Sequence, residues 1–158
     1  MITHGGMMKK SSMIRTAAMG LLFYLVSCGY GLAGQSLLEA DRLVGVWLTE
    51  SKDQVKIHKE AGKYVGKGVE TPENKGRLDT KNPDEKLRNR RLADVIILKD
   101  FVYLGKGRWG KGTIYDPNNG KTYKCTITMK SDEEIKVRGF IGISLLGRTE
   151  TWPRVPTK

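Results

Sequence analysis

Hydrophobic and polar residues alternate with a period of two through most of the chain beyond residue 42. The clearest case is Lys121 to Lys130, where Tyr123, Cys125, Ile127 and Met129 fall on one side and threonines and lysines on the other. Such alternation is typical of a strand with one buried and one solvated face. Similar segments, separated by Gly, Pro and Asn turns, cover residues 42–49, 54–59, 63–70, 93–98 with 101–104, 108–115, 134–140 and 144–152. Eight strands in sequence, with no useful helical period, predict an all-β fold: a single antiparallel up-and-down eight-stranded barrel with no exposed edge.

The two ends of this strand series carry complementary residues. Gly45 and Trp47 lie on the first strand, and Arg148 and Trp152 lie on the last. An arginine can cover an indole face, so we expect Arg148 to lie over Trp47 or Trp152. Trp47, Arg148 and Trp152 are therefore the predicted barrel-closing residues.

The first 33 residues have the pattern of a signal peptide. Lys9, Lys10 and Arg15 precede an apolar run, Thr16 to Val26, that is too short to cross a bilayer as a helix. The predicted organisation is a removable signal peptide over residues 1–33, a linker over 34–41 with room for one helical turn, a barrel over 42–154 and a tail over 155–158.

Two processing routes are open. Gly31-Leu32-Ala33 before Gly34 fits ordinary cleavage, whereas Leu25-Val26-Ser27-Cys28 resembles a lipobox, in which Cys28 would be lipidated after cleavage before it. Both predict an exported protein, periplasmic or secreted, with no transmembrane span. The second route adds a lipid anchor.

The chain keeps a basic balance without its signal segment. Its 28 Lys and Arg outnumber 17 Asp and Glu, and removing residues 1–33 takes away three basic and no acidic residues, leaving a net charge of +8. For an exported protein this favours an acidic envelope surface as partner over nucleic acid, or simply a solvated basic surface. If Cys28 is removed or lipidated, Cys125 has no partner within the chain, and its position in the alternation favours a small buried residue over a reactive thiol.

Motifs along the whole predicted barrel resemble a known bacterial family. They include Gly45-x-Trp47-Leu48-Thr49, Asp79-x-x-Asn82-Pro83-Asp84, Gly112-x-Ile114-Tyr115-Asp116-Pro117 and Gly147-Arg148-Thr149-x-x-Trp152. Together they resemble the small secreted proteins of domain of unknown function 2147. The resemblance implies a lipocalin-like barrel, an envelope location and a cavity for a ligand. It implies no activity, because none is established for the family.

The long polar segment between residues 71 and 91 carries the most unusual charge pattern. Asp79, Asp84 and Glu85 precede Lys86, Arg88, Arg90 and Arg91. Arg88 and Arg90 could hold the anionic head of a ligand, because guanidinium groups bind carboxylate and phosphate in a planar fork. The alternative, which we favour, is that Asp79 or Asp84 pairs with an arginine to order the loop, with Leu87 and Leu92 fixing it to the core.

Residues suited to catalysis or metal binding are scarce. His58 is the single histidine outside the signal segment, so neither a zinc site nor a Ser or Cys nucleophile with its base is evident. We therefore expect a non-enzymatic protein without a cofactor. Strand glycines leave interior room, and the predicted ligand-binding residues are Arg88, Arg90, Tyr64, Trp109, Tyr115, Tyr123 and Arg138.

The leading hypothesis is an exported barrel that binds a small hydrophobic or amphipathic ligand with an anionic end. The alternative is a filled barrel that acts as an envelope interaction module and binds no small molecule. A small eight-stranded barrel can be of either kind.

Overall fold

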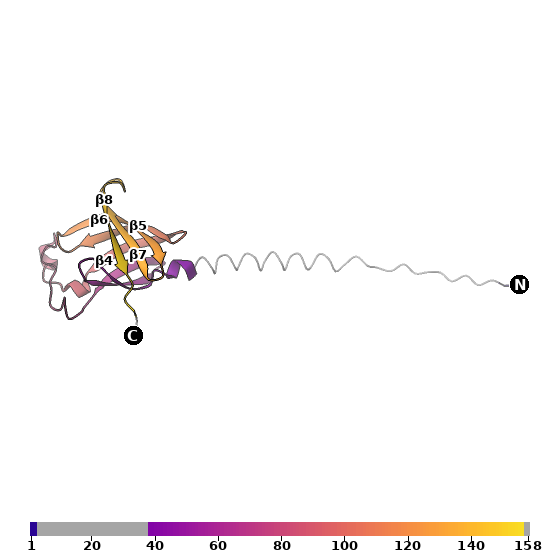
Figure 1. Ribbon diagram of the computed structural model, residues 1–158, viewed down its shortest axis with the longest axis horizontal. Helices are drawn as coiled ribbons and strands as arrows, with labels where there is room; N and C mark the ends of the chain where they lie inside the picture. The colour runs from indigo at the N-terminus through magenta and orange to yellow at the C-terminus, as the bar shows by residue number, and fades with distance from the viewer. Residues whose placement is uncertain (3–37, 157–158) are drawn as a thin grey trace. The chain divides into compact units, whose positions relative to one another are not determined.

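Eight antiparallel strands form one sheet, in which each strand pairs with the next along the chain (Figure 1). The computed structural model describes residues 1–2 and 38–156, so the predicted signal segment and Cys28 lie outside the described residues. Within 38–156, no helix is long and apolar enough to cross a membrane. The strands are β1 Gly45–Leu48, β2 Gln54–Glu60, β3 Lys63–Val69, β4 Ile96–Gly105, β5 Arg108–Asp116, β6 Lys121–Ser131, β7 Glu134–Phe140 and β8 Gly147–Pro153.

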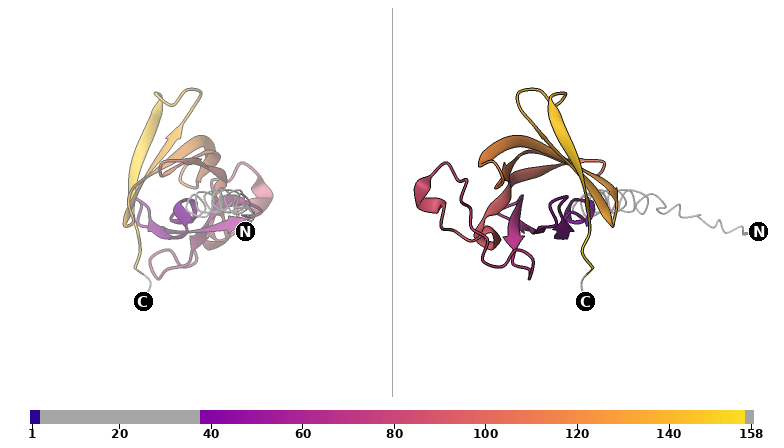
Figure 2. Two further views of the ribbon diagram at one scale, coloured as in Figure 1. Left: turned by 90° about the vertical axis from the view of Figure 1, so that its right-hand side faces the viewer. Right: turned by 60° about the vertical axis from the view of Figure 1, so that its left-hand side comes forward.

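Period-two alternation decides which face of each strand is buried. On β6, Cys125 and Ile127 are each 1% exposed. They lie opposite Gly139 and Val137 of β7 in an antiparallel register. The sheet curls round on itself (Figure 2), and the predicted lipocalin-like up-and-down barrel is confirmed.

The seam between β1 and β8 is where the barrel differs from the prediction. No ladder joins these two strands in the described chain. A single bridge pairs Trp47 with Arg154, and the Val155 N–H donates to the Val46 carbonyl at 2.8 Å. The expectation of a barrel with no exposed edge was therefore wrong, because β1 has only four residues with which to form a ladder. The barrel is nearly closed.

Arg154, rather than the predicted Arg148, covers Trp47. Its guanidinium carbon lies 4.1 Å from the indole centroid, and its nitrogens donate to the carbonyls of Val44 at 2.9 Å and Arg42 at 2.7 Å. Gly45 makes room for this group, since a Cβ there would collide with the Arg154 guanidinium. Arg148 instead lies on the same face of β8 as Trp152, four residues later, and this face is turned toward the barrel interior and not toward the seam.

Residues 38–41 form a helical turn that plugs one end of the barrel. The Ala40 carbonyl accepts a hydrogen bond from Trp109 Nε1 at 3.2 Å, and Asp41 accepts one from the Tyr64 hydroxyl at 2.6 Å. Leu43 beside them is fully buried. The assignment of residues 38–41 to a linker was therefore wrong, because their contacts belong to the barrel core.

The Asp41–Tyr64 hydrogen bond also has an electrostatic signature. Burial is the largest cause that raises the pKa of Tyr64, and the hydrogen bond to the Asp41 carboxylate is the next. The Tyr64 hydroxyl, and then Lys59 at 2.9 Å, lower the pKa of Asp41. The charged carboxylate is thus the form that holds the plug in place.

Strand glycines allow side chains to cross the barrel interior. A Cβ at Gly112 would collide with the ring of Phe101, and one at Gly66 would press on Val55 and Leu98. The expectation that strand glycines leave interior room does not hold at these two positions, because neighbouring side chains occupy the space.

Removing the Arg154 guanidinium should destabilise the barrel selectively. We expect Arg154→Ala to lower the free energy of unfolding by about 2 kcal/mol, since it removes charged hydrogen bonds and a cation–π contact together. Urea denaturation of a chain that begins at Gly34 measures this. Arg148→Ala is the matched control and should change stability by less than about 0.5 kcal/mol, because its ion pairs are exposed. Equal effects would show that the Trp47 contact does not secure the seam.

Candidate functional site

A cavity of about 640 Å³ occupies the half of the barrel away from the helical plug. An up-and-down barrel brings every second connection to the same end. Here these are the β1–β2 loop, the long β3–β4 loop, the β5–β6 turn and the β7–β8 hairpin. All four contribute residues to the cavity, so its mouth opens between them.

The cavity wall is apolar. Apolar residues of β2, β4, β5, β7 and β8 line it, and Leu92 contributes from the long loop. Trp152 is the largest of them and remains 1% exposed although it borders the cavity. The apolar wall residues are Val55, Leu92, Ile97, Ile114, Val137, Phe140 and Trp152.

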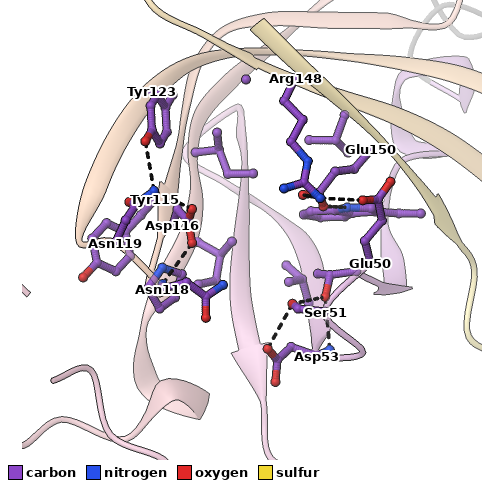
Figure 3. A pocket seen from close by; sticks show the side chains of 18 of the residues that line it. Glu50, Ser51, Asp53, Tyr115, Asp116, Asn118, Asn119, Tyr123, Arg148 and Glu150 are labelled. Atoms are coloured by element: carbon purple, nitrogen blue, oxygen red, sulfur yellow. Dashed lines mark hydrogen bonds and ion pairs between the residues drawn. The ribbon is translucent and has the colours of Figure 1, made fainter. Parts of the chain in front are cut away.

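A charged cluster lies on one side of the mouth (Figure 3). Arg148 pairs with Glu50 at 2.7 Å and with Glu150 at 3.5 Å. The second oxygen of Glu150 accepts a hydrogen bond from the Trp152 indole nitrogen at 2.8 Å. The hydrogen bond to Glu50 is the largest cause that raises the pKa of Arg148, and the negative charges of Glu150 and Glu50 raise it further. The cluster thus joins the β1–β2 loop to β8 above the apolar wall.

Carboxylates and amides border the remainder of the mouth. Asp116 accepts hydrogen bonds from the backbone N–H of Asn118 at 2.9 Å and from the Asn119 side chain at 2.8 Å. Asp53 pairs with Arg77 at 2.8 Å. The cavity lining thus holds four carboxylates and two guanidinium groups, from Glu50, Asp53, Asp116, Glu150, Arg77 and Arg148. A molecule bound here would have an apolar body inside and polar atoms at the mouth.

Two of the predicted tyrosines border this cavity. The Tyr115 hydroxyl donates a hydrogen bond to Asp79 at 2.6 Å. Burial, and then the Asp79 carboxylate, raise the pKa of Tyr115 to about 12. The Tyr123 hydroxyl accepts a hydrogen bond from Asn119 at 3.0 Å. Their role in ligand binding stays a prediction.

The other predicted ligand residues do not line the cavity. Tyr64 and Trp109 pack edge to face at the plugged end, with ring centroids 6.3 Å apart. Arg138 donates to backbone carbonyls of the β7–β8 hairpin. Arg88 and Arg90 belong to the long loop. These five residues therefore do not border this cavity, although Arg90 lines a second, smaller hollow of about 180 Å³ beside β4 and β5. Their role in binding stays a prediction.

The long loop is organised around a buried carboxylate. Asp79 is 0% exposed and accepts hydrogen bonds from Arg90 at 3.0 Å and Asn82 at 2.7 Å, besides the one from Tyr115. Arg88 donates to the Asn82 carbonyl at 2.9 Å. The hypothesis that an aspartate–arginine pair orders the loop is thus confirmed for Asp79.

Two short 3₁₀ turns complete the loop, η1 Glu85–Leu87 and η2 Leu92–Asp94. Leu92 is buried and fixes the loop to the barrel, as expected. Leu87 is 39% exposed, so its predicted contact with the core was wrong.

Sequence reasoning missed Glu50 and Glu150, and placed Arg148 at the seam. The alternation on β8 could have placed two of these residues, Glu150 and Arg148, at the cavity. Trp152 faces inward, so Glu150 and Arg148, two and four residues earlier, share its face. Glu50 lies in a loop, and no sequence pattern places it opposite Arg148.

The cysteine Cys125 is buried and does not border the cavity. Burial raises the pKa of the Cys125 thiol to about 12, so it remains protonated and unreactive at neutral pH. Within the part of the chain that the structure describes, no three His, Cys, Asp or Glu side chains are arranged to hold a metal ion.

Comparison with known proteins agrees with the fold. A family model described as "Uncharacterized protein conserved in bacteria (DUF2147)" matches residues 45–154. Among solved structures, protein HP1028 from Helicobacter pylori, described as belonging to the lipocalin family, matches with a TM-score of 0.67 and 26% identity. The match covers 72% of this chain and 83% of that one. No curated protein matches the chain.

Loss of the Asp79 carboxylate should disorder the long loop. We expect Asp79→Ala to lower the free energy of unfolding by about 3–5 kcal/mol, because it leaves the Arg90 charge without its buried partner. Chemical denaturation checks this. Asp84→Ala, which removes an exposed cap of η1 in the same loop, is the control and should cost about 1 kcal/mol. Similar costs for the two variants would contradict an organising role for Asp79.

Proposed function

The chain belongs to the bacterial DUF2147 family and forms a lipocalin-like barrel, and from this premise we propose that it binds a small hydrophobic or amphipathic molecule in the barrel cavity. The proposed role is binding without catalysis or cofactor, in an exported protein. The location rests on the signal-like sequence of residues 1–33.

The cavity is the observation that carries this proposal. Its volume of about 640 Å³ falls in the range of small-molecule sites, which span roughly 300–1,000 Å³. It combines a continuous apolar wall with a few polar groups at one end, the arrangement that orients an amphipathic ligand. A barrel filled from end to end would support the alternative of a ligand-free module, and here only the plugged half is filled.

The polar end of the ligand would meet Arg148. The sequence predicted that Arg88 and Arg90 bind the anionic end of the ligand, but both form hydrogen bonds and ion pairs within the long loop. Arg148 is the guanidinium on the inner face of β8, and its side chain is 74% exposed. We propose that an anionic group of the ligand takes the place of Glu50 beside Arg148, while the apolar body contacts Trp152.

Native mass spectrometry of the protein purified from its own envelope is the direct test. We expect a mass above that of the chain that is lost on denaturation, and the difference gives the mass of the ligand. A chain that carries no added mass, and that also binds neither probe below, would contradict a binding function.

Two fluorescent probes separate the apolar and anionic parts of the proposal. Anilinonaphthalene sulfonate carries an anionic end, and phenylnaphthylamine is its uncharged relative. We expect Ile114→Trp to weaken binding of both by narrowing the cavity. Thr128→Trp, on the outer face of β6, should leave both unchanged.

Arg148→Ala should weaken binding of the sulfonate by about tenfold and leave the uncharged probe unaffected, since one charged hydrogen bond contributes about 1.5–3 kcal/mol. Arg88→Ala is the matched control and should affect neither. Glu50→Gln should strengthen sulfonate binding by freeing Arg148. The opposite order, weaker binding in Glu50→Gln and stronger in Arg148→Ala, would point to a cationic ligand.

A further inference from the structure

The tip of the β7–β8 hairpin exposes four large aliphatic side chains within six residues. Ile141 is 68%, Ile143 60%, Leu145 81% and Leu146 71% exposed. The hairpin projects beyond the other strands at the top of the right-hand view in Figure 2, in yellow. Single exposed aliphatic residues are common on proteins, but a cluster of four at a projecting tip marks an interaction site.

Arg138 holds this tip in a defined shape. Its guanidinium donates to the Ser144 carbonyl at 2.8 Å, the Leu145 carbonyl at 3.2 Å and the Thr149 hydroxyl at 2.7 Å. The Ile141 N–H also donates to the Leu146 carbonyl at 3.2 Å. The aliphatic side chains are therefore presented by a braced turn, so an apolar environment can receive them with little further ordering.

The outer face of the same sheet is basic. Lys124, Lys130 and Lys136 are exposed on β6 and β7, and the segment from Lys121 to Lys130 contains no acidic residue. Among the described residues, no carboxylate lies within ion-pair distance of these lysines or of Arg138. Lys124 pairs in register with Phe140, directly beside the base of the tip. Unneutralised positive charge thus adjoins the apolar tip.

The tip also forms part of the cavity mouth. Ile141 and Leu146 line the cavity, while Ile143 and Leu145 do not. A surface that received the tip would therefore lie next to the opening through which a ligand enters.

We infer that the β7–β8 hairpin inserts into an anionic lipid bilayer, with Ile143 and Leu145 among the acyl chains and Lys124 and Arg138 against the headgroups. This orientation turns the cavity mouth toward the membrane, so a hydrophobic ligand passes between bilayer and barrel without crossing water. The membrane contact goes beyond the proposed ligand binding and does not require an occupied cavity.

Charge complementarity selects lipid as the occupant. Each lysine or arginine near an anionic membrane surface contributes about 1 kcal/mol, and aliphatic side chains gain further free energy by leaving water. A protein groove that accepted the tip would also need carboxylates placed to form ion pairs with these lysines. An anionic bilayer supplies both the apolar layer and the negative charge.

Vesicle sedimentation tests the inference. The chain from Gly34 is used, because it contains all core residues of the barrel and lacks both the apolar signal segment and Cys28. We expect binding to vesicles of equal phosphatidylglycerol and phosphatidylcholine, and much weaker binding to phosphatidylcholine alone. Raised salt should weaken the binding to the anionic vesicles.

Matched variants locate the contact. Ile143→Ser with Leu145→Ser should lower the partition coefficient at least about tenfold, the effect of losing one buried aliphatic side chain. Leu104→Ser, an exposed leucine near the plugged end, should have no effect. Lys124→Glu should lower binding about tenfold or more, whereas Lys130→Glu, six residues along the same strand, should lower it much less.

A tryptophan at the tip reports insertion directly. Ile143→Trp should shift its emission to the blue on adding anionic vesicles, and lipids brominated on their acyl chains should quench it. The double serine variant should still bind the uncharged probe in solution, because neither residue lines the cavity. Loss of probe binding with vesicle binding retained would therefore contradict the proposed function alone.

Three results would overturn the inference. These are unchanged vesicle binding by the double serine variant, equal binding to neutral and anionic vesicles, and tip-dependent self-association without lipid. The last would make a second copy of the chain the occupant of the tip.

Discussion

The contact between Arg154 and Trp47 is the interaction on which the barrel depends. β1 is too short to form a ladder with β8, so one guanidinium joins the ends of the sheet through an indole face and backbone carbonyls. The close approach explains Gly45, where any side chain would collide with the arginine. A curved sheet with one weak seam is held as a barrel by this side chain together with a single backbone bridge.

With the seam secured, the interior divides into two halves of different character. The half near residues 38–41 is filled by Trp47, Tyr64, Phe101 and Trp109 and fixed by hydrogen bonds to the plug. The other half contains the cavity, because its inward residues are smaller aliphatic side chains around a single Trp152. The filled half gives the barrel its stability, and the open half is available for binding.

The mouth combines the features that give the molecule its proposed roles. Ion pairs such as Arg148–Glu50 lie beside the apolar tip of the β7–β8 hairpin, and the long loop approaches from the other side, ordered by Asp79. Ligand entry and membrane contact would therefore occur at one end of the barrel. The plugged end takes no part in either.

The sequence alone predicted the number and order of the strands and most of the inward residues, since period-two alternation and turn residues are local properties. It was wrong at residues 93–95 and 144–146, which it assigned to strands, because β4 begins at Ile96 after the η2 turn and β8 begins at Gly147. It also indicated that an aspartate in the long loop pairs with an arginine. It did not determine which arginine covers Trp47, that residues 38–41 plug the barrel, or that Glu50 meets Arg148. Those contacts join residues that are far apart in the sequence, 98 positions in the case of Glu50 and Arg148. They follow from the curvature and register of the nearly closed sheet, which decide the arrangement in space and leave no periodic signal in the chain.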